Sequence, residues 1–181
     1  MRRVFLGIDL SNDLKNRLEI LKARYNLSNL PIKLVEPENS HIAIKFLDNL
    51  TEEQVSVVSK LIKEQINEIE PFEVVVSNSL IFLNIQKPKV LSLKIISSEL
   101  NKFGTQLITL LDELDFITND HREYIPHLTL GRIKATLNDY EKDKIASIQF
   151  NGNMIINAFH LFESLLTSTG PKYNIIEEYK L

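Results

Sequence analysis

The chain has 181 residues, a length typical of one domain, and its 44% hydrophobic and 25% charged residues are those of an ordinary globular protein. No apolar run is long enough to cross a bilayer, and the net charge of −3 argues against a protein that coats nucleic acid non-specifically. That charge does not exclude a small anionic ligand in a local basic pocket. The absence of cysteine excludes disulfides, thiolate metal ligands and a cysteine nucleophile, and we expect a cytoplasmic location.

The first half of the chain alternates between strand and helix patterns. Leu14, Leu18 and Leu21 recur at helical spacing, and Ser11 or Asn12 can cap that helix. The stretch that follows contains two prolines, which break helices, so it is expected to be a loop with one short strand. We therefore expect a strand at 3–9, a helix at 12–25, a short strand near 32–35, a strand at 41–47 and a helix at 52–68.

The second half contains the same kinds of element in a similar order. Two β-rich runs joined by a loop at 84–88 are typical of antiparallel neighbours. The next helix has Leu100, Phe103, Leu107 and Leu111 on its apolar face. The expected elements are strands at 71–83 and 89–95, a helix at 98–114, a strand at 127–133, a short helix at 138–146, one long or two short strands within 147–167, and a last strand at 172–181.

This order indicates an α+β fold built twice on a similar plan. A β-α-β-α unit is followed by a β-β-α-β-α unit, and each contains one strand that begins with histidine. We expect two pseudo-symmetric lobes with antiparallel sheets around a central cleft, and the histidine strands facing each other from opposite lobes. No Pro/Gly/Ser-rich linker separates the halves, so residues 1–181 are expected to form a single two-lobed domain.

The two histidine strands have similar sequences, HIAIKFL at 41–47 and HLTLGRI at 127–133. In a regular strand, residues i and i+2 face the same way, about 6.6–6.8 Å apart along the chain. His127 and Thr129 therefore point into the same space, while the leucines between and after them hold the strand against the core. Arg132 would turn to the opposite face unless a bulge or bend at Gly131 reorients it.

The same alternation applies to the first motif. His41, Ala43 and Lys45 should share one face, and Phe46 should turn towards the core. Lys45 has two possible roles, either lending charge to a bound anion or standing as a solvated lysine at the end of the strand. The alternation by itself favours the solvated lysine slightly.

Two imidazoles facing one cleft can supply both halves of a displacement at phosphorus. An unperturbed histidine titrates near pH 6.5, so one ring can take a proton from water while the other gives one to the leaving oxygen. A single histidine at the start of a strand is more often an ordinary polar residue, but two similar motifs favour a shared site. Two histidines could also hold zinc, yet no carboxylate or third histidine stands at ligand spacing beside either, so we expect no metal and no cofactor.

The chain resembles the two-histidine (2H) phosphoesterases, and within them the LigT-like RNA 2′,3′-cyclic phosphodiesterases, also called 2′-5′ RNA ligases. The similarity extends over nearly the whole length. It is carried by RRVFLGIDLSNDLKNRL at the start, VEPENSHIAIKFLDNL around the first motif, the central hairpin, REYIPHLTLGRIK around the second motif and FESLLTSTGPKYNII near the end. One His-x-Thr-x motif is a weak signal, whereas two in this order and context are specific.

The resemblance implies an activity and roles for single residues. It implies metal-independent hydrolysis of RNA 2′,3′-cyclic phosphate ends to 2′-phosphomonoesters, with His41 as proton donor and His127 as proton acceptor. Thr129 and Arg132 would bind the substrate phosphate. Ala43 stands where the family usually has Thr or Ser, so this motif position lacks the hydroxyl. We expect the partner to be an RNA or oligonucleotide end, with no membrane and no metal involved, and the protein to be a monomer.

Two other functions remain open at this point. The same site could cleave or join 2′-5′ linkages, although the chain has no P-loop or lysine motif that would activate a nucleotide. Alternatively, the protein could be an RNA-end-binding module whose catalysis is weakened, as Ala43 suggests. Incubation with a nucleoside 2′,3′-cyclic phosphate and EDTA separates these functions.

Overall fold

The computed structural model describes the whole chain except residues 67–68, 83–87, 120–122 and 169, and the side chains of 78–82. The elements are β1 (Arg2–Asp9), α1 (Asn12–Arg24), β2 (Ile32–Leu34), β3 (His41–Leu50), α2 (Glu52–Gln65), β4 (Phe72–Phe82), β5 (Val90–Ile96), α3 (Ser98–Asp112), β6 (His127–Ile133), α4 (Asp139–Ala146), β7 (Asn151–Ile156), β8 (Ala158–Leu166) and β9 (Pro171–Lys180). Short 3₁₀ turns lie at Leu27–Asn29 and Pro37–Asn39. None of the described helices combines the length and apolarity that a membrane span needs.

The predicted elements are present, with small shifts at their ends. The first three helices end one to three residues before their predicted ends, at Arg24, Gln65 and Asp112. The segment 147–167 contains two strands, β7 and β8, and not one long strand. Thr51 begins α2 with a full capping box, because its hydroxyl accepts from the Gln54 amide while the Gln54 side chain accepts from the Thr51 amide.

Among the described residues, nine strands form one antiparallel sheet in the order β7-β4-β5-β6-β3-β1-β8-β9, with β2 paired to β6. The sheet has two halves, one containing β6 and the other containing β3. They meet where Ile42 of β3 pairs with Leu128 of β6. The expected α+β fold with two similar antiparallel halves is confirmed, and the structure adds that the two sheets are joined into one.

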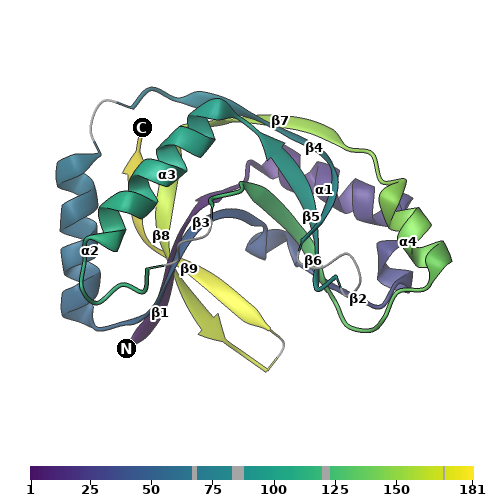
Figure 1. Ribbon diagram of the computed structural model, residues 1–181, viewed down its shortest axis with the longest axis horizontal. Coiled ribbons are helices and arrows are strands. Elements are labelled where there is room, and N and C mark those ends of the chain that lie inside the picture. Colours follow the sequence, from purple (N-terminus) through teal and green to yellow (C-terminus); the bar gives the residue numbers. More distant parts are fainter. Residues whose placement is uncertain (67–68, 83–87, 120–122, 169) are drawn as a thin grey trace.

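The helices cover the outside of this curved sheet in pairs. In Figure 1, α2 and α3 lie beside the half that contains β3, whereas α1 and α4 lie beside the half that contains β6. The helix that follows β1 packs against β7 in the other half, and the helix that follows β5 packs against β3. Each half is thus covered in part by a helix that crosses over from the other half.

Apolar side chains from both halves meet under these helices. Leu14 and Leu18 of α1 and Leu100, Leu107 and Leu111 of α3 are at most 1% exposed. In β1, alternate residues point to this core, and they are Val4, Leu6 and Ile8. The residues of β1 between these three therefore point to the opposite face of the sheet, away from the helices. The two histidines lie on that face.

A β-bulge interrupts β3 just after its first motif residues. Ala43 and Lys45 pair with two consecutive residues of β1, so β3 contains one extra residue at this point, and a second register shift follows between Phe46 and Asp48. The bulge reverses the alternation beyond it. Lys45 is consequently buried with its Nζ 2.7 Å from Asp112 Oδ1, and the Phe46 side chain is 60% exposed. The predictions that Lys45 shares a face with His41 or is solvated, and that Phe46 packs in the core, are wrong because they assumed regular alternation.

An equivalent bulge interrupts β6. Thr129 and Gly131 pair with two consecutive residues of β5, and Arg132 beyond them is exposed. The bend that we anticipated at Gly131 is therefore present. Only glycine fits there, because a Cβ atom would lie 2.5 Å from Ile32 Cγ2 and 2.8 Å from the Lys33 carbonyl oxygen of β2.

The buried Lys45–Asp112 pair predicts a large effect on stability. Replacing Lys45 by Met leaves Asp112 without its partner, and we expect the free energy of unfolding to fall by about 3–5 kcal/mol in urea titrations. Lys60, whose side chain is 76% exposed beside Glu64, is the matched control, and Lys60→Met should change it by less than about 0.5 kcal/mol. Equal effects of the two substitutions would contradict the buried position of Lys45.

Candidate active site

His41 and His127 begin neighbouring strands at the point where the two halves of the sheet join. Ile42 and Leu128 pair across the two strands, and both are fully buried on the core side. Because side chains alternate along a strand, the residues that flank this pair point to the opposite face. Antiparallel register places His41 across from Thr129 and Ala43 across from His127, and directly opposed residues have Cβ atoms about 4.5–5.5 Å apart.

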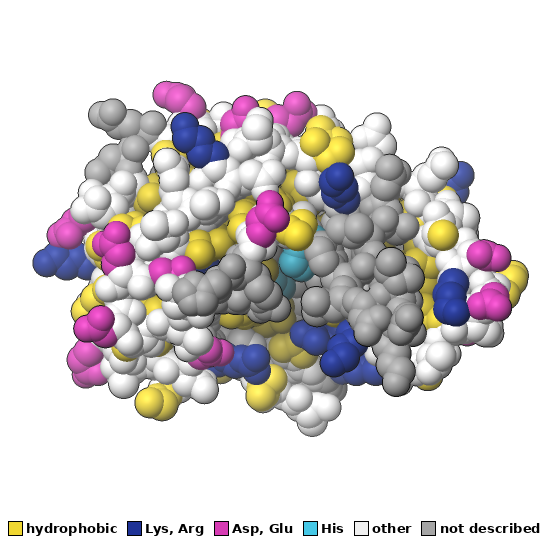
Figure 2. Space-filling view, viewed as in Figure 1, with side chains coloured by type: hydrophobic (Ala, Val, Ile, Leu, Met, Phe, Trp, Pro, Cys, Tyr) yellow, Lys and Arg dark blue, Asp and Glu magenta, His cyan; other side chains and the backbone are white. Residues whose placement is uncertain are grey.

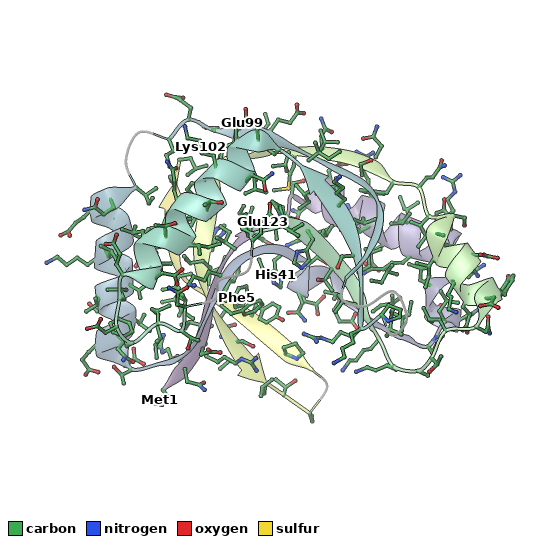
Figure 3. The ribbon with its side chains drawn as sticks, viewed as in Figure 1. Met1, Phe5, His41, Glu99, Lys102 and Glu123 are labelled. Carbon is green, nitrogen blue, oxygen red and sulfur yellow. The ribbon has the colours of Figure 1, made fainter. Side chains whose placement is uncertain are left out.

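This face is hollowed around the histidines. Figure 2 shows histidine side chains in a recess at the centre of the molecule, and Figure 3 shows His41 and Phe5 in the same central region. The two histidine strands were expected to face each other from opposite lobes. They lie side by side instead, within one sheet, and this brings the imidazoles together without any closure of a cleft.

Both imidazoles are held through the same ring nitrogen. His41 Nδ1 lies 2.7 Å from the carbonyl oxygen of Asn39, and His127 Nδ1 lies 2.8 Å from that of Ile125. A carbonyl oxygen can only accept, so in each ring Nδ1–H is the donor. Nε2 is then the nitrogen of each ring that is left to exchange a proton with a ligand. The equivalent contact, two residues upstream in both strands, gives the two rings the same orientation.

Aromatic rings surround His41 on one side. The ring centroid of Phe5 lies 4.8 Å from that of His41, and Tyr173 presents its edge at 5.0 Å with an interplanar angle of 85°. Burial among these rings lowers the pKa of His41, and the charge of His127 lowers it further. The Asn39 carbonyl and Asp9 act in the opposite direction. Burial is the largest effect, so the free protein favours the neutral His41 ring.

The other predicted site residues lie around the histidine pair. Thr129 is half-buried on the same face of β6 as His127. Arg132 is turned towards the site by the bulge at Gly131, and its positive charge reaches the Tyr173 hydroxyl beside His41. Ala43 presents only a methyl group, and its carbonyl oxygen accepts a hydrogen bond from the Tyr124 hydroxyl at 3.3 Å.

Sequence reasoning missed Phe5 and Tyr173, which come from β1 and from the last strand. Their contacts with His41 depend on the pairing of β1 with β3 and on the path of the β8–β9 hairpin, and no local motif marks either residue. His160 is buried in β8 with its Nε2 3.4 Å from Oε2 of Glu178, its pairing partner in β9, and it is not part of the histidine pair. His121, the remaining histidine, lies outside the described residues. Within the described part of the chain, no three His, Asp or Glu side chains gather where they could hold a metal ion.

The surroundings of His41 predict its titration. We expect its imidazole to titrate below the ordinary pKa of 6.5 when followed by NMR in the free protein, because burial disfavours the charged ring. Asp9→Asn should lower the pKa further by removing a favourable negative charge, and His127→Gln should raise it by removing a positive one. A midpoint at or above 6.5 in the unliganded wild type would show that the ring is solvated.

Comparisons with known proteins agree with this fold. The model of a family described as LigT-like phosphoesterase matches residues 8–91. The RNA 2′,3′-cyclic phosphodiesterase of Methanocaldococcus jannaschii is 31% identical over 98% of this chain and 99% of its own. The protein of the same name from Methanothermobacter thermautotrophicus is 28% identical over 99% and 98%.

Solved structures have the same fold over their full length. The crystal structure of TT0787 from Thermus thermophilus superposes with a TM-score of 0.86 at 22% identity, covering 99% of this chain and 97% of that one. The E. coli LigT structure in complex with 3′-AMP has a TM-score of 0.81 at 19% identity, covering 99% and 98%. From the full-length similarity to the M. jannaschii protein, and from the fold, we conclude that this chain belongs to the LigT-like phosphoesterases.

Proposed function

We propose that this protein is an RNA 2′,3′-cyclic phosphodiesterase that opens the cyclic phosphate at an RNA end and leaves a 2′-phosphomonoester. The observation that carries the proposal is the pair of imidazoles at the join of the two sheet halves, each with Nδ1 held by the carbonyl of the residue two positions upstream. Relatives that carry this name match the chain over nearly its full length, which supports the assignment.

The chemistry needs one base and one acid. His127 Nε2 takes a proton from water as the water oxygen attacks phosphorus, and the bond from phosphorus to the ribose 3′ oxygen breaks. His41 Nε2–H gives its proton to that leaving oxygen, so a 2′-phosphate and a free 3′ hydroxyl result. The assignment of donor and acceptor follows the family. His41 must be protonated when the reaction starts, and an anionic phosphodiester beside the ring favours that charged form.

The remaining residues hold the substrate. We assign the Thr129 hydroxyl and the Arg132 guanidinium to the phosphate oxygens, since both lie on the histidine face of β6. Phe46 is the corresponding residue of β3, five positions after its histidine, and its exposed ring lies 5.5 Å from Phe5. An exposed aromatic ring beside a phosphate site suits stacking with the terminal base. Ala43 offers no hydroxyl, so the phosphate is held mainly from the β6 side.

We also propose that the reaction needs no metal ion, because the two imidazoles by themselves can carry out both proton transfers. We also propose that residues 1–181 act as one domain, since the site is made of strands from both halves. The cytoplasmic location and the monomeric state expected from the sequence stay predictions.

Histidine substitutions test the proposal. With EDTA present, His41→Ala and His127→Ala should each lower kcat on a nucleoside 2′,3′-cyclic phosphate by about 10²–10⁴-fold, because each removes one proton transfer. The double variant should lose far less than the product of the two losses, since both groups act in one transition state. His160→Gln, which changes a histidine outside the site, is the control for activity, and circular dichroism checks that each variant is folded.

Substrates with different leaving groups separate the two roles. A nitrophenyl phosphodiester has a leaving oxygen that needs no proton, so His41→Ala should lower kcat less for this substrate than for the cyclic phosphate. His127→Ala should harm both substrates alike, because water must still be activated. If the nitrophenyl substrate is turned over well by His127→Ala and poorly by His41→Ala, then His127 is the proton donor and His41 the acceptor. Tight binding of the cyclic phosphate without turnover by the wild type would indicate an RNA-end-binding module instead of an enzyme.

A further inference from the structure

Tyr173 and Arg3 lie next to the histidine site but have no part in the reaction described above. Tyr173 reaches His41 from β9, with ring centroids 5.0 Å apart, and its ring is also 5.0 Å from that of Phe5. Arg3 is two residues before Phe5 in β1 and therefore lies on the same face of the sheet, about 6.6–6.8 Å further along the strand. Tyr173 pairs with Ser164 of β8, and Ser164 and Arg3 line one open depression.

The two neighbouring arginines of β1 differ in whether their charge is paired with a carboxylate. Arg2 lines the same depression, but its Nε lies 2.7 Å from Glu52 Oε1 and 3.7 Å from Glu163 Oε1. Arg3 is exposed, and among the described residues no carboxylate forms an ion pair with it. Glu163 also lines the depression but is engaged by Arg2, and Asp48 lines it as well. Arg3 and Arg132 are the two positive charges that act on Tyr173.

The environment of the Tyr173 hydroxyl agrees with this arrangement. Burial raises the pKa of Tyr173, and the charges of Arg132 and Arg3 lower it. The raised pKa keeps the phenol protonated, so it can donate a hydrogen bond to an anion that the two guanidinium groups attract. Figure 2 shows Lys and Arg side chains along the lower margin of the recess that exposes histidine.

We propose that Arg3 and Tyr173 form a second phosphate-binding site, for the phosphate on the 5′ side of the terminal nucleotide. This inference rests on the proposed function, because the scissile cyclic phosphate must lie at the two histidines. Under this inference, the next phosphate of the strand, one nucleotide away, lies on the Tyr173 side of His41. The protein would accordingly prefer an RNA end, or a nucleotide that carries a 5′-phosphate, over an unphosphorylated cyclic nucleoside.

Two small substrates that differ only in this phosphate provide the test. We expect wild-type kcat/KM to be about tenfold or more higher for adenosine 5′-phosphate 2′,3′-cyclic phosphate than for adenosine 2′,3′-cyclic phosphate. Arg3→Gln should bring this ratio close to one, and Tyr173→Phe, which keeps the ring, should reduce it in the same direction. Lys102→Gln removes one positive charge from an exposed residue of α3 that does not line the depression, and it should leave the ratio unchanged.

The outcomes separate this inference from the proposed function. If wild type turns over both substrates at equal kcat/KM, the second site is absent. If the ratio is high but Arg3→Gln does not lower it, other residues bind the 5′-phosphate and the assignment is wrong. If neither substrate is turned over, the proposed function fails. The second site is then tested by calorimetry, which compares the affinities of adenosine 2′,5′-bisphosphate and adenosine 2′-phosphate. Tighter binding of the bisphosphate that is lost in Arg3→Gln supports the second site, and equal binding overturns it.

Discussion

The pairing of Ile42 with Leu128 joins the two halves of the sheet, and the candidate active site depends on that join. Both residues are fully buried, so they fix which face of each strand meets the helices and which face is left open. His41 and His127 are the residues immediately before this pair in their own strands. Because the strands run antiparallel, the two histidines fall on either side of the join, and both face the recess.

The bulges that follow are the second requirement of the site. Each begins two residues after a histidine and reverses the alternation of the strand, so that the residue five positions after the histidine faces the recess. That residue is Phe46 in one half and Arg132 in the other. The same geometry therefore supplies an aromatic ring on one side of the histidine pair and a guanidinium on the other. The residue before Phe46 is Lys45, and the residue before Arg132 is Gly131. Both turn inward, Lys45 into the core and Gly131 against β2, where a side chain would not fit.

Much of this could be predicted from the sequence. Helix ends followed from caps and apolar spacing, and the two motifs identified His41 and His127 because their similarity is visible in the chain itself. Lys45 and Phe46 were misplaced, because a bulge depends on how a strand pairs with its neighbour, and alternation within one strand does not reveal it. Tyr173 and Phe5 reach His41 only through strand pairing between segments far apart in the chain. The joining of two sheets at a single residue pair likewise has no local signal.

The two halves of the site are similar but not equal. Thr129 offers a hydroxyl on β6, whereas Ala43 on β3 has none, although each imidazole is held by the carbonyl two residues upstream. Such a site still requires that one ring protonates the oxygen that leaves. The most direct measurement is ³¹P NMR of the product that the chelator-treated protein forms from adenosine 2′,3′-cyclic phosphate. The proposed reaction, in which the bond to the ribose 3′ oxygen breaks without a metal, predicts adenosine 2′-phosphate as the single product, and formation of the 3′-phosphate, or turnover only after a metal is added back, would contradict it.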